Sequence, residues 1–464
     1  MELEKLFAYK TDRIIDVIEK INNNALKTAF IVDNNQHLLG IVSDGDIRRA
    51  ILNDIPLTTS IEEIMNKNPL VGKIGISEAK ILDILLDKVI QIIPILDDNK
   101  KVVKYYHLRD FIKEKFLKDT VKESITTKQS KKVLIIGGAG YIGSMLSRIL
   151  LEQGYFIRVL DNLTFGEKSI ADLKLNPNFE LIVGSYTNFE KLIPCLKNVD
   201  AVVHLAAIVG DPAGNIDPEL TEEINYHGVK VLAEFCKFYR IQRLIFTSTC
   251  SVYGASNNDI LNEESLLNPV SLYAETKLKA EKALLKAKTK FFHPCIIRLA
   301  TVFGLSYRMR FDLVINLLTA LSIRKKEISI FSGKQWRPFV HVKDVGRSIL
   351  NILNQPIEKI SGEIFNIGND KNNFQIEDIG ELLRQIFPDI KVNKVEEKED
   401  KRSYRVSFNK AKEILNFSAE NIIEDGIKEI ANYMYKTAID ITDSQYSNYK
   451  NFQYGEFESI SFFE

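Results

Sequence analysis

The stretch FTSTCSVYG, residues 246–254, crowds small polar side chains directly behind the apolar segment RLIF. Hydroxyl groups at the end of a buried strand can hydrogen-bond the hydroxyl of a substrate. For that substrate hydroxyl to react, a nearby group must also remove its proton. The downstream segment SLYAETK supplies Tyr273 and Lys277. Their i, i+4 spacing places both side chains on one face of a helix. A nearby cation favours the anionic form of a phenol, which titrates near ~10 when free. The pattern therefore suggests a proton relay beside an oxidisable hydroxyl.

An electron acceptor is predicted from the segment KKVLIIGGAGYIGSMLSRILLEQG, which begins at residue 131. VLIIG is apolar throughout, as a parallel strand buried on both faces should be. Gly137, Gly140 and Gly143 follow it and lead into a helix, where a Cβ would block the approach of a pyrophosphate. The helix N-terminus adds free N–H groups for the phosphates. Asp161, at the end of the next strand, can accept from both ribose hydroxyls and would repel a 2′-phosphate, which favours NAD over NADP.

Glycine loop, hydroxyl-rich strand end and Tyr-x-x-x-Lys follow one another in an order that resembles the extended short-chain dehydrogenase/reductase family, specifically its sugar-nucleotide epimerases and dehydratases. The resemblance covers most of residues 131–435 and includes HLAA (204–207), NYHG (225–228), WRPFVHVKDV and FNIGN. It implies that Tyr273 is the base, that Lys277 supports it and that Thr249 hydrogen-bonds the reacting oxygen. The implied NAD contacts are Gly137, Gly140, Tyr141, Ile142, Gly143, Asp161, Asn162, Ser185, Tyr186, Leu205, Ala206, Ala207, Asn225, Thr247, Tyr273 and Lys277.

The same resemblance implies a nucleotide-sugar substrate, linked to UDP, GDP or dTDP. Arg337 matches the arginine that the family uses on the nucleotide diphosphate, and arginine suits bidentate phosphate contacts. Arg308 and Arg310 are either further contacts or solvated surface charges. Thr301 stands where many relatives have Asn. The expected substrate-binding residues are Val209, Cys250, Ser251, Thr301, Arg308, Arg310 and Arg337.

The reaction class follows from the two residues after Thr249. The 4,6-dehydratases of the family carry an Asp-Glu pair there, whereas this chain has Cys250 and Ser251. Neither can protonate a leaving hydroxide at its ordinary pKa. The sequence therefore predicts a C4 epimerase, with a 4-dehydrogenase/reductase and a non-catalytic NAD and adenine-nucleotide sensor as alternatives. Cys250 is either an inert buried thiol or an acid/base group in epimerisation.

The N-terminal quarter contains two copies of one small βαβ-type unit, with strands at TAFIVD and LLGIVS in the first and at IIPILD and KVVKYYH in the second. The segment LLGIVSDGDIRRAI followed by IEEIMNKNPL resembles a CBS domain, and residues 1–120 resemble a CBS pair. That resemblance implies that Ser43 and Asp46 hold the ribose of AMP, ADP or ATP. In the second copy His107 replaces the hydroxyl residue, while Asp110 keeps the acid. A packing and dimerisation module without a ligand is the alternative.

The bulk composition limits the remaining possibilities. The 464 residues carry 62 basic and 62 acidic side chains, which argues against a nucleic-acid partner. Four cysteines without a CxxC pair indicate reduced thiols and no metal site. We see no signal peptide and no membrane span, so a cytoplasmic protein is expected. The CBS pair is expected to drive dimerisation, which predicts a homodimer or higher homo-oligomer.

The predicted fold class is α/β: a Rossmann-type doubly wound parallel sheet with a smaller C-terminal substrate-binding α/β lobe, preceded by an α+β CBS pair. The expected domains are the CBS pair at 1–120, a linker at 121–130, the NAD-binding domain at 131–297, the lobe at 298–440 and a tail at 441–464. The tail is rich in Tyr and Phe and is expected to pack on a partner or on the chain itself.

Overall fold

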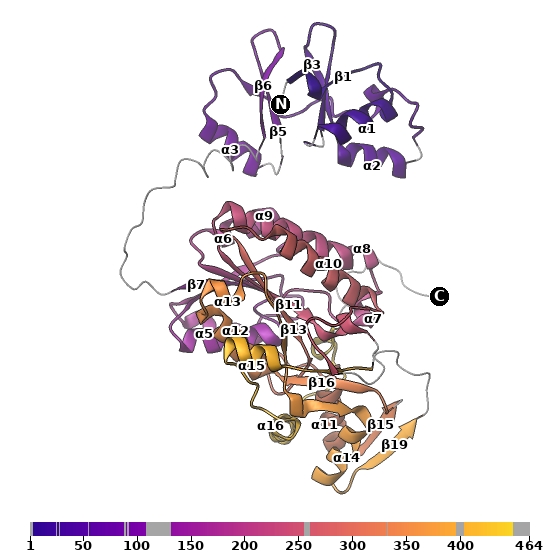
Figure 1. Cartoon of the computed structure of the whole chain (residues 1–464), viewed down its shortest axis with the longest axis vertical. Coiled ribbons are helices and arrows are strands. Elements are labelled where there is room, and N and C mark those ends of the chain that lie inside the picture. The colour runs from indigo at the N-terminus through magenta and orange to yellow at the C-terminus, as the bar shows by residue number, and fades with distance from the viewer. Residues whose placement is uncertain are drawn as a thin grey trace. The chain divides into compact units, whose positions relative to one another are not determined.

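The computed structural model describes residues 3–107, 131–254, 260–331, 333–395 and 403–448, apart from residues 25, 27, 54, 88, 89 and 91. The chain divides into two compact units, Met1–Thr126 and Thr127–Glu464 (Figure 1). The predicted linker, Asp110 of the second copy and the tail beyond residue 448 lie outside the described residues.

The N-terminal unit contains the predicted repeat. In each copy a short strand pairs in parallel with a second strand, which pairs antiparallel with a third. Phe30 and Val32 of the first copy share a core cluster with Ile92 and Val102 of the second. The first copy contains β1 (Phe7–Tyr9), α1 (Ile14–Asn23), β2 (Thr28–Val32), β3 (Leu38–Ser43) and α2 (Asp44–Leu52). The second contains β4 (Gly72–Lys73), α3 (Glu78–Asp87), β5 (Ile92–Leu96) and β6 (Val102–His107).

A seven-stranded parallel sheet forms the centre of the larger unit, in the order β17-β13-β11-β10-β7-β8-β9. The apolar segments predicted as buried strands form it, because helices cover both faces and leave no strand a solvated side. The order reverses between β7 and β10, as in a doubly wound Rossmann sheet. The strands are β7 (Lys132–Ile136), β8 (Phe156–Asp161), β9 (Phe179–Val183), β10 (Ala201–His204), β11 (Arg243–Thr249), β13 (His293–Leu299) and β17 (Ile364–Ile367).

The helices form two layers, one on each face of the sheet (Figure 1). The apolar side chains of α5, α12 and α15 pack in one core cluster with Val133, Ile135 and Ile157 of the sheet. Those of α6, α9 and α10 pack in a second cluster with Leu134, Val202 and Leu244. The bounds are α5 (Tyr141–Glu152), α6 (Phe189–Leu196), α9 (Gly228–Phe238), α10 (Leu272–Ala287), α12 (Val342–Asn354) and α15 (Asn409–Leu415).

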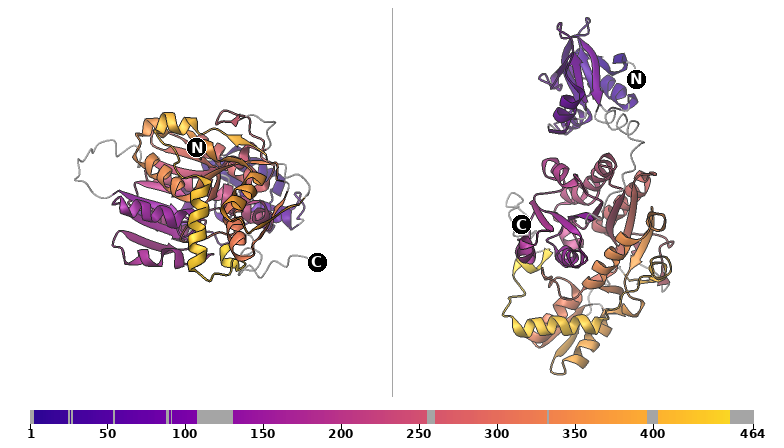
Figure 2. Two further views of the ribbon diagram at one scale, coloured as in Figure 1. Left: turned by 90° about the horizontal axis from the view of Figure 1, so that it is seen from below. Right: turned by 90° about the vertical axis from the view of Figure 1, so that its left-hand side faces the viewer.

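A smaller α/β lobe has its own core and is formed mostly by the last third of the chain (Figure 2). It contains α11 (Val314–Arg324), α14 (Ile376–Ile386) and α16 (Ile423–Lys436). Its strands are β14 (Thr301–Phe303), β15 (Glu327–Phe331), β16 (Trp336–His341), β18 (Asn373–Gln375) and β19 (Lys391–Val395). The remaining short elements of this unit are α7 (Asp211–Gly214), α8 (Pro218–Glu222), β12 (Ile260–Leu261), α13 (Ile357–Ile360) and β20 (Arg405–Val406).

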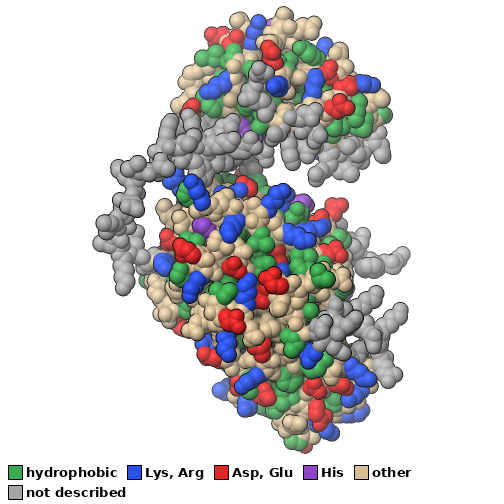
Figure 3. Space-filling model, in the orientation of Figure 1, with side chains coloured by type: hydrophobic (Ala, Val, Ile, Leu, Met, Phe, Trp, Pro, Cys, Tyr) green, Lys and Arg blue, Asp and Glu red, His purple; other side chains and the backbone are tan. Residues whose placement is uncertain are grey.

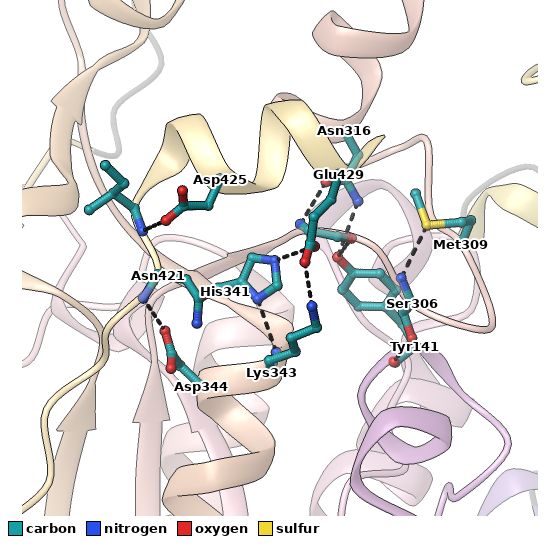
Figure 4. A network of polar contacts seen from close by, with 12 residues as sticks. Tyr141, Ser306, Met309, Asn316, His341, Lys343, Asp344, Asn421, Asp425 and Glu429 are labelled. Carbon is teal, nitrogen blue, oxygen red and sulfur yellow. Dashed lines mark hydrogen bonds and ion pairs between the residues drawn. The ribbon is translucent and has the colours of Figure 1, made fainter. Parts of the chain in front are cut away.

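A polar network ties the lobe to the first helix of the sheet domain (Figure 4). The Tyr141 hydroxyl donates a 2.6 Å hydrogen bond to Gly304 O and accepts one of 3.2 Å from Asn316 Nδ2. Ser306 Oγ donates to Tyr141 O at 2.6 Å. Nearby, His341 Nε2 lies 3.0 Å from Glu429 Oε2. The loop after β14 is therefore held against the N-terminus of α5.

The surface has no strong charge bias on the face shown in Figure 3, where basic and acidic side chains are interspersed. None of the helices in the described ranges combines the length and the apolar character needed to cross a bilayer.

Candidate active site at the switch point of the sheet

A cavity of about 480 Å³ opens at the carboxyl ends of the parallel strands, where the strand order reverses. This is where ligands bind in open α/β sheets, because two crossover connections diverge there and leave a crevice. Its walls come from the segments that follow β7, β8, β10, β11 and β13, together with α10 and the loop after β14.

The glycine loop forms one wall of the cavity. A Cβ atom would meet different surroundings at each of its three predicted glycines. Gly137 has φ +86°, and a Cβ there would lie 2.7 Å from Ala206 N. A Cβ on Gly143 would lie 2.3 Å from Gly137 O, so this glycine permits the close packing of α5 on the loop. At Gly140 the nearest atom would be Gly137 O at 3.4 Å, which leaves space for a ligand. Such a cradle below a helix N-terminus suits a diphosphate.

Asp161 ends β8 and lies at the cofactor side of the same cavity. Its Oδ2 accepts a 2.9 Å hydrogen bond from Ala139 N, and its Oδ1 accepts one of 2.8 Å from Leu163 N. These two bonds fix the carboxylate and leave lone pairs for further donors. Burial raises the pKa of Asp161, although the two N–H groups oppose that effect. The group can accept hydrogen bonds from a ribose diol.

The hydroxyl-rich stretch lies at the carboxyl end of β11. Thr249 Oγ1 accepts a 3.1 Å hydrogen bond from Ser251 N, which caps the short helical turn that follows. Thr247 Oγ1 donates to His204 O at 2.9 Å, so it links β11 to β10. Thr247, Thr249 and Ser251 all line the cavity. The crowded hydroxyls therefore combine two tasks, ending the strand and providing a polar wall.

Tyr273 and Lys277 occupy the first two turns of α10, which Ser271 caps by accepting from Ala274 N at 3.3 Å. Both residues line the cavity. The Lys277 ammonium lies 4.1 Å from the centroid of the Phe246 ring, and only 2% of the residue is exposed. Burial lowers the pKa of Lys277 to about 7, opposed by the Glu281 carboxylate one turn further on. This lysine can therefore exchange a proton near neutral pH.

A buried ion pair fixes α10 against the sheet. Arg298 Nη2, from β13, lies 2.8 Å from Glu281 Oε2, and both side chains are almost fully buried. Ser248 Oγ donates to Glu281 from β11. The Tyr253 hydroxyl accepts from Arg298 Nη1 at 3.0 Å and donates to Asn366 Oδ1 at 2.8 Å. Because the side chains of this network are buried and bonded to one another, it holds the register between α10 and the end of β11.

Most of the predicted site residues lie around this one cavity. Its lining includes Gly137, Gly140, Tyr141, Ile142, Gly143, Asp161, Asn162, Ser185, Tyr186, Leu205, Ala206, Ala207, Val209, Thr247, Thr249, Ser251, Tyr273, Lys277, Thr301, Arg308 and Arg310.

Three predicted residues are not in that lining, and each has another place. Asn225 holds the loop after β10, because Nδ2 donates to Ile208 O and Oδ1 accepts from Ile208 N, both at 2.9 Å. The guanidinium of Arg337 donates to its own neighbour, Trp336 O, at 2.9 Å and lies 5.6 Å from the Tyr404 ring centroid. Cys250 is turned into the core, where its thiol donates to Arg298 O at 3.4 Å.

The position of Cys250 argues against the acid/base alternative. Burial raises the pKa of its thiol far above the ordinary range. All four cysteines are buried and free, so the thiol of Cys250 matches the inert alternative.

The cavity is also lined by residues that the sequence analysis did not name, among them Phe165, Asp312 and Asn448. Phe165 comes four residues after Asp161, so the position of a loop at the end of β8 was a usable signal. Asp312 follows the predicted arginines and accepts both hydrogen bonds of the Arg310 fork, at 2.9 and 2.8 Å. Asn448 had no signal at all, because it comes from a segment without recognisable periodicity.

Ser43 and Asp46 lie in the N-terminal unit, at the start of α2. Ser43 Oγ donates to Asp46 Oδ2 at 2.6 Å, and Ser43 N donates to the same oxygen at 2.8 Å. Arg49 pairs with Asp46 Oδ1. Ser43 Oγ also accepts a hydrogen bond from Asp46 N at 3.4 Å, so it caps the N-terminus of α2.

Comparisons with known proteins agree with this architecture. The model of the NAD dependent epimerase/dehydratase family matches residues 133–368, and the CBS domain model matches residues 4–53. The chain is 30% identical over 316 residues to UDP-glucuronate 4-epimerase of Thermodesulfobacterium geofontis, covering 65% of this chain and 95% of that protein. It is 28% identical over 310 residues to a putative UDP-glucose 4-epimerase of Methanocaldococcus jannaschii, covering 65% and 98%.

A solved structure of a UDP-glucuronic acid 4-epimerase from Bacillus cereus, in complex with UDP-glucuronic acid and NAD, superimposes with a TM-score of 0.59 at 30% identity. It matches 66% of this chain and 99% of that one. The chain therefore belongs to the NAD dependent epimerase/dehydratase family and carries an N-terminal CBS domain.

Proposed function

We propose that this protein is an NAD-dependent nucleotide-sugar C4 epimerase. One observation carries the proposal: a single cavity is lined by the glycine loop, by Asp161, and by Thr249, Tyr273 and Lys277. A cofactor cradle alone would serve a sensor as well. A hydroxyl, a phenol and a buried lysine next to the cradle are what alcohol oxidation needs.

NAD is the cofactor that this site fits. Gly140 leaves room for a diphosphate, the N-terminus of α5 adds N–H donors, and Asp161 accepts from the adenosine ribose. When bound, NAD supplies a hydride acceptor for an alcohol carbon. Solved structures of relatives contain NAD, which supports the assignment.

Tyr273 takes the proton of the sugar C4 hydroxyl and returns it when the carbonyl is reduced. Thr249 holds the reacting oxygen by a hydrogen bond. Lys277 supplies a positive charge that favours the tyrosinate. Its pKa near 7 allows it to pass a proton on at neutral pH. Inversion at C4 would require that bound NAD supply the hydride back to the opposite face of the sugar.

The charged groups of the cavity favour epimerisation over dehydration. Asp161 and Asp312 are the carboxylates among its described lining residues, and Asp312 is paired with Arg310. Elimination of water needs an acid that protonates the leaving group. Cys250 points away from the cavity, and Ser251 is not acidic. Among the described lining residues, the sugar end therefore has groups for removal and return of hydrogen and no carboxylic acid for elimination.

The substrate class that the relatives support is a UDP-linked hexose or hexuronic acid, because one relative is named UDP-glucuronate 4-epimerase and another putative UDP-glucose 4-epimerase. We assign Val209, Ser251 and Thr301 to the sugar and diphosphate side of the cavity, and Arg310 to its polar rim. We further propose that Ser43 and Asp46 bind the ribose of an adenine nucleotide, and that the protein acts in the cytoplasm as a homodimer or larger homo-oligomer.

The test incubates the purified full chain, without added cofactor, with a panel of UDP-, GDP- and dTDP-sugars. Products are identified by mass spectrometry and NMR. A C4 isomer of unchanged mass is expected, with UDP-sugars preferred. A keto-sugar equal in amount to reduced cofactor, and no isomer, would instead identify a 4-dehydrogenase. Bound NAD without turnover of any nucleotide sugar would identify a sensor.

A further inference from the structure

The segment after α16 folds back onto the same unit. Ile439, Ile441 and Tyr446 pack against a small apolar cluster that includes Met309, Phe311 and Met434. The Phe311 and Tyr446 ring centroids lie 5.6 Å apart, and Phe311 N donates to Tyr446 O at 2.9 Å. In the right-hand view of Figure 2, the yellow chain after α16 runs from the lobe toward the violet strands of the sheet.

This segment ends in the cavity wall. Asn448 Oδ1 accepts a 2.8 Å hydrogen bond from Arg308 Nη1, and Asn448 N donates to Asp312 Oδ2 at 3.0 Å. Asn448 and Arg308 are both only 6% exposed, and both line the cavity. The last described residue of the chain is thereby part of the site.

Arg308 is a buried cation whose hydrogen-bonding capacity is largely unused. Among the described residues, its Nε and Nη2 have no hydrogen-bond partner. The neighbouring Arg310 differs, because its fork is fully engaged by the Asp312 carboxylate. Burial and the neighbouring Arg310 charge lower the pKa of Arg308 to about 9, against the raising effect of Asp312 and Asp161. A buried guanidinium with unsatisfied donors is expected to meet an anion.

The surroundings of Arg308 place that anion on the cofactor side. The guanidinium carbon lies 3.8 Å from the centroid of the Phe165 ring, which belongs to the loop after Asp161. Asp161 itself interacts electrostatically with Arg308. The loop that carries Arg308 is fixed to the N-terminus of α5 by the bonds between Tyr141, Gly304 and Ser306 (Figure 4). The free donors therefore belong to the part of the cavity next to the glycine loop.

We propose that Arg308 binds a phosphate of the NAD diphosphate, and that Asn448 of the C-terminal segment positions it. The proposal rests on NAD as the cofactor in the proposed function. A diphosphate also occurs in a nucleotide sugar, so the test separates the two sources. In this arrangement the segment 440–448 completes the cofactor site, and Asn448 orients Arg308 without adding a competing charge.

The test measures binding of NAD and, separately, of UDP by titration calorimetry on the full chain stripped of bound nucleotides. Arg308→Gln is expected to raise the Kd for NAD by about 10- to 100-fold, the range of a lost charge-assisted hydrogen bond, and to change the Kd for UDP less than about twofold. Asn448→Asp keeps an acceptor for Arg308 but places a carboxylate against it, so it should raise the Kd for NAD about tenfold. Gln445→Ala, whose amide only bonds Asp443 in the same turn, is the control and should change neither.

Thermal unfolding of the nucleotide-free variants separates binding from folding. Asn448→Asp is expected to unfold within a few degrees of the wild type, since a carboxylate strengthens the contact with Arg308. If Arg308→Gln weakened UDP binding and spared NAD, the cation would belong to the substrate, and the proposal would be wrong. Unchanged binding of both ligands would also overturn it. None of these readouts requires turnover, so failure of the epimerase assignment is detected separately by the sugar panel.

Discussion

At the residue scale, the site depends on charges and polar groups placed where water cannot reach them. Lys277 is held under Phe246 and Tyr273 lies one turn before it, at the cavity wall. The lysine is buried among apolar groups, and the carboxylate of Glu281 that could compensate it is occupied by Arg298. This arrangement keeps the ammonium easy to deprotonate and available to the phenol.

Replacing Tyr273 by Phe removes the hydroxyl and leaves the ring. We expect kcat for epimerisation to fall by about 10³-fold, the typical contribution of a positioned acid–base group. The Kd for NAD should change less than about twofold, because the glycine loop and Asp161 are untouched. Tyr435→Phe, at a largely exposed tyrosine on α16, is the matched control. Turnover within a few-fold of wild type in Tyr273→Phe would exclude this residue as the base.

His204 provides a prediction about pH. It is fully buried between the rings of Tyr186 and Phe246, and burial lowers its pKa to about 3. The unfolded chain therefore binds more protons than the folded one between about pH 6.5 and 3, so the free energy of unfolding decreases as the pH falls through this window. From pH 7 to pH 5, His204 should account for a loss of about 2 kcal/mol.

The variant His204→Phe keeps an aromatic ring and forfeits no side-chain hydrogen bond, since neither ring nitrogen has a partner among the described residues. Urea unfolding at the two pH values should show a loss about 2 kcal/mol smaller than in the wild type. An equal decrease of the unfolding free energy in both proteins would mean that His204 can be protonated in the folded state.

At the scale of elements, two glycines of the glycine loop have different roles: Gly143 permits packing of α5, and Gly140 leaves room for the cofactor. Gly143→Ala would drive a Cβ to 2.3 Å from Gly137 O and should cost about 1–3 kcal/mol of unfolding free energy. Gly140→Ala has no such clash and should cost less than about 1 kcal/mol, but it should raise the Kd for NAD at least about tenfold because the new methyl group faces the diphosphate. Denaturant unfolding and calorimetry distinguish the two. Loss of stability in Gly140→Ala, with binding intact, would reverse this assignment.

Local pattern predicted the elements that end at the cavity. The apolar runs VLIIG, IRVLD and RLIF became β7, β8 and β11, because a strand covered on both faces needs apolar side chains at every position. The residues that follow each run reach one rim, since the strands are parallel. Arg337 shows where this reasoning ends. A family position identified it, yet its guanidinium turns to Trp336 O, and a rotamer is decided by packing that no motif encodes. Asn448 could not be foreseen, because 140 residues separate it from its partner Arg308.

At the scale of the whole molecule, two compact units share one chain. The smaller unit consists of two copies of one small α/β unit, and Ser43 and Asp46 lie at the start of α2 in the first copy. The larger unit contains the complete candidate site. The described residues that line the cavity all belong to the larger unit, so ligand binding in each unit can be tested by separate substitutions.

Asp46→Ala should abolish binding of ATP or AMP to the full chain, because it removes the carboxylate proposed to hold the ribose. The epimerase rate without adenine nucleotide should remain within about twofold of wild type. Calorimetry with both nucleotides and the sugar assay measure these quantities, with Glu62→Ala, an exposed acid of the same unit, as the control. Wild-type protein that gives no heat with either nucleotide would leave the unit as a packing module.

The central claim is that hydrogen leaves C4 of the sugar and returns to the same carbon. The most direct measurement uses UDP-glucose and UDP-glucuronic acid that carry deuterium at C4, in ordinary water, with NMR of the products. We expect the C4 epimer of at least one sugar, with deuterium retained at C4. An epimer whose C4 deuterium had been replaced by solvent hydrogen, or no epimer from either sugar, would contradict this account.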